Sequence, residues 1–114
     1  MRKLIIEEKA EQLVAEVARL LTTIHYRCKA SNDLDRSADS ALLCVGEAVA
    51  VFLPRKKKDK YDIARGEAGE VKKALIALVK KRKLTEEDIK VAYGLADEMC
   101  AILTTMIKNL EDRY

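Results

Sequence analysis

The sequence predicts an all-α protein, folded as an antiparallel up-down four-helix bundle. It contains one proline and four glycines in 114 residues, and strands joined by turns would need more of both. Apolar residues recur every three or four positions along most of the chain, the spacing of amphipathic helices. Four such segments with short connections favour an up-down bundle. We expect one domain, residues 1–114.

The first predicted helix covers about residues 3–25. Its apolar residues recur at helical spacing: Ile6, Ala10, Leu13, Val17, Leu20 or Leu21, and Ile24. Residues 28–33, CKASND, are expected to form a loop. Ser31, Asn32 or Asp33 can then accept hydrogen bonds from the first N–H groups of the next helix.

The second predicted helix covers about residues 34–53 and ends before Pro54, which cannot easily continue a helix. Its last part, ALLCVGEAVAVFL, carries a single charge in thirteen residues. A helix that is apolar all round must be covered on more than one side, and crossing a bilayer takes about 20 residues. We therefore expect other helices and a second copy of the chain to cover it. The expected subunit contacts on this helix are Val45, Val49 and Phe52.

The third predicted helix covers about residues 58–82. Its apolar seam alternates steps of three and four as in a coiled coil: Tyr61, Ala64, Ala68, Val71, Leu75 and Leu78. Gly66 and Gly69 lie away from this seam, and each costs about 0.8 to 1 kcal/mol relative to alanine. They are either tolerated exposed glycines or points where another subunit approaches closely. We place both at the subunit contact.

The fourth predicted helix covers about residues 86–111. Thr85 is its expected N-cap, Asp88 sits at the third helical position, and Leu84 and Ile89 form the flanking hydrophobic staple. The residues expected to point inward are Ala92, Leu95, Met99, Ile102, Met106 and Leu110.

Positive charge is concentrated between residues 55 and 83, although the net charge of the chain is only +3. This segment holds twelve Lys and Arg against four acids. Lys58, Arg65 and Lys72 are seven residues apart, so one helix face can join the basic ends into a track of about 35 to 40 Å. Lys and Arg are the usual phosphate ligands, although a lysine-rich face can also serve solubility alone. The expected nucleic-acid contacts are Arg55, Lys56, Lys57, Lys58, Lys60, Arg65, Lys72, Lys80, Lys81, Arg82 and Lys83. Tyr61 is the one nearby aromatic, so base-specific readout is expected to be weak.

The sequence contains no complete catalytic motif of a known helical enzyme class. His25 is the single histidine, whereas metal-carboxylate bundles need Glu-x-x-His on two helices. Glu7-Glu8-x-x-Glu11 is similar to the acidic motif of helical nucleotide pyrophosphohydrolases, but the Glu-x-x-Asp of their next helix is missing. The three cysteines are far apart and fit neither a zinc site nor a disulfide framework. We expect no enzymatic activity, no metal and no cofactor.

Glu47 is the lone charge of the apolar run, and burial of an unpaired carboxylate is costly. A structural ion pair is therefore expected, with Arg36, Arg65 or a base of a neighbouring subunit as its partner. Glu70 on the third helix raises the same question.

Short motifs on the second and third helices resemble one family. Arg36-Ser37-Ala38-x-Ser40 with Glu47, then Ile63-Ala64-Arg65-Gly66-x-Ala68-x-Glu70, are similar to the four-helix-bundle 23S rRNA intervening-sequence proteins. Those proteins typically read R-x-A-x-S-x-x-x-N-I-A-E-G and I-A-x-G-S-x-x-E. The likeness extends over nearly the whole chain. Cys44, Ala48 and Glu67 depart from the usual Asn, Gly and Ser, and loss of that glycine is expected to let the second helix run on to Leu53.

The resemblance implies a homopentameric ring, since characterised family members form one. The related accessory variability proteins of diversity-generating retroelements present a basic surface and bind a reverse transcriptase and RNA. Our leading hypothesis is a non-enzymatic pentameric bundle that binds structured RNA or a ribonucleoprotein. The alternative is a protein-interaction subunit, for example an accessory factor of a reverse transcriptase. A cytoplasmic location without membrane contact is expected, because acids interrupt the start of the chain before a signal peptide can form.

Overall fold

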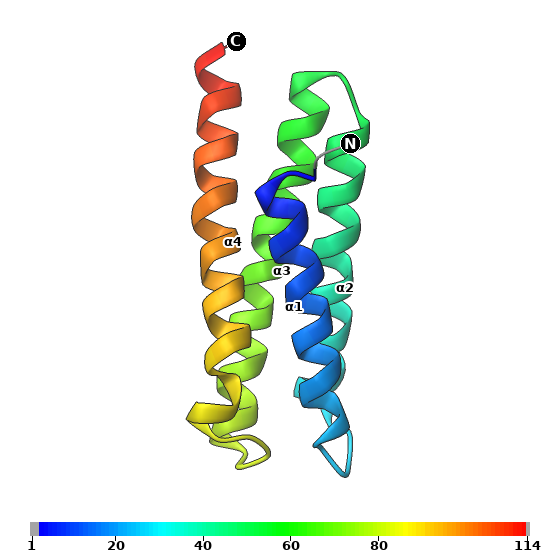
Figure 1. Cartoon of the computed structure of the whole chain (residues 1–114), viewed down its shortest axis with the longest axis vertical. Helices are drawn as coiled ribbons and strands as arrows, with labels where there is room; N and C mark the ends of the chain where they lie inside the picture. Colours follow the sequence, from blue (N-terminus) through cyan, green and yellow to red (C-terminus); the bar gives the residue numbers. More distant parts are fainter. Residues whose placement is uncertain (1–2, 114) are drawn as a thin grey trace.

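The computed structural model describes residues 3–113, with side chains through Glu111. Four helices make up the fold: α1 (Ile5–Thr22), α2 (Lys29–Ala50), α3 (Pro54–Lys80) and α4 (Glu86–Arg113). They lie side by side and run alternately up and down (Figure 1) in a body of 47 × 26 × 21 Å. Each helix packs against two neighbours, with α1 and α4 closing the ring of contacts. The predicted all-helical four-helix fold is confirmed.

The core is aliphatic and follows the predicted periodicity closely in α1 and α3. The six seam residues of α3 are all buried, and Tyr61 exposes 2% of its surface. In α4 the prediction is right as far as Met99 and then shifts by one residue. Leu103 and Ile107 are buried, whereas Ile102 and Met106 are only partly covered. Beyond Met99 the inward stripe advances in steps of four, because a straight helix has 3.6 residues per turn and drifts from a strict heptad.

Helix α2 begins five residues earlier than predicted, at Lys29. Cys28 is its extended N-cap, and Ser31 is buried in the first turn. The Ser31 hydroxyl accepts from the Cys28 N–H at 2.8 Å and donates to the Cys28 carbonyl at 2.9 Å. Ser31 therefore caps α2 from a position inside its first turn. Residues 29–33, which were expected to form a loop, belong to the helix.

Helix α2 ends at Ala50, three residues before the predicted end. Val51 is extended, and Leu53 has φ −71° and ψ 122° as the N-cap of α3. Pro54 occupies the first position of α3, where its missing N–H costs nothing. The Lys57 ammonium donates to the Ala48 carbonyl at 2.7 Å, which satisfies a C-terminal acceptor of α2. The connection is thus a three-residue corner, and α3 starts four residues earlier than predicted.

The predicted cap of α4 is present. The Asp88 N–H donates to the Thr85 hydroxyl at 3.0 Å, and the Thr85 N–H donates to the Asp88 carboxylate at 2.8 Å. This second bond lowers the pKa of Asp88. Leu84 and Ile89 are both buried and form the staple.

Arg82, in the turn between α3 and α4, has a positive φ of 60°. The Arg82 N–H donates to the Val79 carbonyl at 3.0 Å, and the Lys83 N–H donates to the Leu78 carbonyl at 2.9 Å. These two bonds define a Schellman motif, whose left-handed position is usually glycine. A residue with a Cβ is disfavoured there by about 1 kcal/mol.

We expect Arg82→Gly to raise the free energy of unfolding by about 1 kcal/mol, because glycine adopts this backbone without the steric cost. Urea denaturation of the purified protein measures it. Arg82→Ala is the matched control, since it removes the same charge but keeps the Cβ. Equal stability of the two variants would show that charge repulsion in the turn, not the backbone, sets the cost.

Candidate nucleic-acid interface

The predicted basic stripe of α3 faces α4 and is largely used within the bundle. Three of its bases, spaced seven residues apart, each contact a side-chain oxygen of α4. The three acceptor residues of α4 are also seven apart, and the two helices run in opposite directions. The contacts are Lys58 Nζ to Glu111 Oε1 at 3.0 Å, Arg65 Nη1 to Thr104 Oγ1 at 3.3 Å, and Lys72 Nζ to Asp97 Oδ1 at 3.1 Å. We call these contacts the α3–α4 ladder. Such flanking pairs are typical of antiparallel coiled-coil packing.

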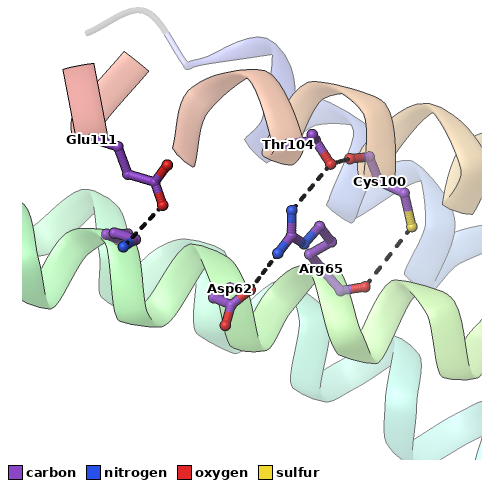
Figure 2. Close-up of polar contacts among 6 residues, drawn as sticks. Asp62, Arg65, Cys100, Thr104 and Glu111 are labelled. Atoms are coloured by element: carbon purple, nitrogen blue, oxygen red, sulfur yellow. Dashed lines mark hydrogen bonds and ion pairs between the residues drawn. The ribbon is translucent and has the colours of Figure 1, made fainter. Parts of the chain in front are cut away.

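Arg65 is the most fully engaged base of the α3–α4 ladder (Figure 2). Besides Thr104, its guanidinium binds the Asp62 carboxylate at 2.6 Å. Its backbone carbonyl accepts a hydrogen bond from Cys100 Sγ at 3.8 Å. Burial raises the pKa of the Cys100 thiol, which therefore packs as a neutral group. Lys72 also lies 5.8 Å from the centre of the Tyr93 ring. The middle of α3 thus offers little unpaired charge.

Two further predicted RNA contacts are also engaged. Lys57 binds the Ala48 carbonyl and lies 6.0 Å from the Tyr61 ring. Lys60 pairs with Glu47 at 2.6 Å. Tyr61 itself is buried, so it is not available to stack on a base.

The remaining predicted contacts separate into two exposed groups at the ends of α3. Among residues 3–111, none of them lies within ion-pair distance of an acidic side chain. We call Arg55 and Lys56 the corner cluster, and Lys80, Lys81, Arg82 and Lys83 the turn cluster. Helix α3 has 27 residues, which places them about 40 Å apart. The structure therefore shows two separate basic sites in place of one continuous track.

The start of α3 is electrostatically unusual. Its first turn carries Arg55, Lys56 and Lys57, no acidic residue and no side-chain cap. Positive side chains are unfavourable near a helix N-terminus, where the helix dipole is positive. A bound anion would relieve this repulsion.

Glu47 was expected to form an ion pair in the interior, and the expected burial is wrong, because the carboxylate lies at the surface. It is 52% exposed and pairs with Lys60, while Arg36 pairs with Glu67 at 3.2 Å. The hydrogen bond from Lys60 to Glu47 raises the pKa of Lys60. Glu70 pairs with Lys73 at 3.4 Å on the surface of α3. Both acids form ion pairs, but exposed ones.

We expect Glu47→Ala and Glu47→Leu to have equal, small effects on stability, because exposed ion pairs contribute little. The urea midpoints of the two variants and the parent protein provide the measurement. A loss with alanine that leucine restores would indicate a buried charge and contradict the exposure found here.

The predicted subunit contacts divide into buried and exposed residues. Val45 is 1% exposed and belongs to the core of its own chain, so its assignment to a subunit contact is wrong. Val49 is 37% exposed and Phe52 is 95% exposed. Gly66 and Gly69 have open space where a side chain would begin, so packing within the described chain does not require glycine at either position.

Sequence reasoning missed two exposed apolar residues, Leu43 on α2 and Ile63 on α3, which are 65% and 50% exposed. They lie between the two ion pairs that link these helices, Arg36–Glu67 and Glu47–Lys60, and so at the same level of the bundle. Gly46 lies three residues after Leu43, and Gly66 lies three residues after Ile63. We call Leu43, Gly46, Ile63 and Gly66 the α2–α3 face. Leu43 lies within the apolar run ALLCVGEAVAVFL. That run was the sequence signal from which its exposure to a partner could have been predicted.

The acidic motif of α1 serves local structure. Glu7 accepts from the Leu4 N–H at 2.9 Å and caps the helix, while Glu11 pairs with Lys3 at 2.6 Å. Within the part of the chain that the structure describes, no three His, Cys, Asp or Glu side chains are grouped to hold a metal ion. No described helix is both long and apolar enough to span a membrane.

Fold and surface together define an all-helical four-helix bundle with two exposed basic clusters. The chain belongs to the 23S rRNA-intervening sequence protein family, whose sequence profile matches residues 2–105, as the short motifs predicted. It is similar to the crystal structure of a protein of unknown function from the S23 ribosomal protein family of Bacteroides thetaiotaomicron VPI-5482. The TM-score is 0.84 at 20% identity, over 91% of this chain and 99% of that one. No curated protein sequence matches the chain significantly.

Proposed function

We propose that this protein is a non-enzymatic RNA- or ribonucleoprotein-binding bundle that acts as a homo-oligomeric ring, most simply a pentamer. The turn cluster is the observation that carries the proposal. It presents four consecutive exposed bases without an acidic partner among residues 3–111, and one of them, Arg82, occupies a backbone position that favours glycine. An arginine at a backbone position that favours glycine points to a role for its side chain outside the turn.

RNA is the polyanion that fits this surface best. Phosphate contacts by Lys and Arg dominate affinity for nucleic acids and do not require a shaped pocket. The family name links related proteins to 23S rRNA, which supports an RNA ligand. Two clusters about 40 Å apart on one helix suit an extended, structured RNA better than a small anion.

Ring assembly is supported by the α2–α3 face. Leu43 and Ile63 expose large apolar side chains next to helical glycines that the single chain does not need. Small residues let a second helix approach closely, and the apolar pair would be buried in that contact. A ring repeats the basic clusters around one axis and so multiplies weak phosphate contacts.

A protein-interaction subunit is the second candidate, and the same face favours it. Leu43 and Ile63 could be covered by a different protein, such as a reverse transcriptase, with the basic clusters facing its acidic surface. In that case the purified protein would be monomeric and would not bind RNA by itself.

The test is binding of the purified protein to a structured 23S rRNA fragment over a salt series. We expect tight binding at low salt and a steep, linear fall of log affinity with log salt. Absence of binding at low salt would overturn the proposal and leave the protein-interaction candidate. A shallow salt slope would equally contradict a surface built on phosphate contacts.

A further inference from the structure

The corner between α2 and α3 holds a surface hollow of about 490 Å³ beside the last turns of α4. Its lining residues are Leu53, Pro54, Arg55, Lys56, Lys58, Leu110 and Glu111. This volume falls in the range of small-molecule sites, about 300 to 1,000 Å³. Leu53, Pro54 and Leu110 are its apolar lining residues, and Arg55, Lys56, Lys58 and Glu111 are its charged ones.

The charged lining residues have a net positive charge that the described chain does not neutralise. Lys58 and Glu111 compensate each other, with Nζ and Oε1 3.0 Å apart. Arg55 and Lys56 are exposed and have no acidic partner among residues 3–111. The hollow is therefore complementary to a ligand that combines an apolar part with an anionic group.

Phe52 stands immediately before this hollow and is 95% exposed, more than any other large apolar side chain described. It lies in the extended corner, so no helix neighbour covers either face of its ring. Exposed aromatic rings beside Lys and Arg are the common means of holding unpaired bases, because every base has a face that can stack. Phe52 thus supplies an exposed aromatic group beside the corner cluster, in place of the buried Tyr61.

We propose that the corner binds one unpaired nucleotide of an RNA. The base stacks on the exposed ring of Phe52, and Arg55 and Lys56, three and four residues further along the chain, hold the adjoining phosphate. This inference rests on the proposed RNA-binding function and gives it a preference for unpaired nucleotides. Phe52 is then exposed to RNA and is not part of the subunit contact in which it was first expected.

The experiment uses a short single-stranded RNA that carries one 2-aminopurine, and a duplex of the same sequence. Abasic sites flank the 2-aminopurine, so that neighbouring bases do not quench it in the free strand and a loss of fluorescence reports stacking on an aromatic side chain. We expect the wild-type protein to quench the single strand. Phe52→Leu should abolish the quenching and weaken single-strand binding about tenfold, because one stacked base contributes about 1 to 3 kcal/mol. Duplex affinity should not change.

Phe52→Trp is the matched rescue, since it keeps an aromatic face at the same exposed position, and it should restore both quenching and affinity. Unaltered quenching in Phe52→Leu overturns this inference but leaves RNA binding in place. If Phe52→Leu instead lowers the assembly mass in light scattering, the Phe52 side chain is part of a subunit contact, and the inference is also overturned. Failure of the wild-type protein to bind either RNA would refute the proposed function itself.

Discussion

Replacing all four bases of the turn cluster with alanine should weaken binding to structured RNA by about 10²- to 10³-fold near 0.1 M salt. Each lost phosphate contact reduces the slope of log affinity against log salt by about 0.7 to 0.9. Four contacts therefore remove about 3 from the slope. Fluorescence anisotropy with a labelled 23S rRNA fragment, repeated over the salt series, measures both quantities. Because the turn is exposed, circular dichroism should show an unchanged helix content.

The control removes the same amount of charge from bases that already have acidic partners. These are Lys60, Arg65, Lys72 and Lys73, which pair with Glu47, Asp62, Asp97 and Glu70. Their replacement by alanine should leave most of the salt slope in place, since paired bases release few counterions on binding. An equal loss in the two variants would mean that RNA senses only the net charge of the protein, and the turn cluster would lose its special role.

Leu43→Glu combined with Ile63→Glu should reduce the mass seen by light scattering to that of the 12.8 kDa chain. Both side chains are at least half exposed in the single chain, so the helices should stay folded. In a packed contact between copies, each added carboxylate would lose its water without gaining a partner, which is strongly unfavourable. Leucine at Gly66 and Gly69 together should have the same effect by blocking close approach.

Val91→Glu is the control for this second prediction. Val91 is 59% exposed on α4, outside the α2–α3 face, and its replacement should leave the mass unchanged. An unchanged mass in the Leu43 and Ile63 variant would rule out the α2–α3 face as the subunit contact. A parent protein that is itself monomeric would contradict the ring.

The fold was predictable because helical periodicity is local. The seam of α3 and the cap of α4 could both be identified from residues close together in the chain. The boundaries of α2 were less accessible, since Ser31 acts from inside the first turn and Lys57 reaches back to Ala48. Neither contact has a standard sequence signature. Each depends on the geometry of one corner.

The partners of the basic stripe could not be deduced from one helix. Asp97, Thr104 and Glu111 are also seven apart, but their match to the bases of α3 depends on how the two helices are aligned. For Val45 the signal was present: Ala41, Val45 and Ala48 share one face by helical spacing and are buried together. The high apolar content of the run concealed this pattern, and with it the outward direction of Leu43 and Glu47.

The length of α3 has a consequence for any ligand that contacts both basic clusters. Both clusters lie at the ends of the same helix, so the 27 residues of α3, at about 1.5 Å each, set the distance between them. A helix does not stretch, so this distance is fixed whatever its alignment with α4. An RNA that touches the corner cluster and the turn cluster of one subunit must bridge about 40 Å. Selection by length can then operate without any base being read.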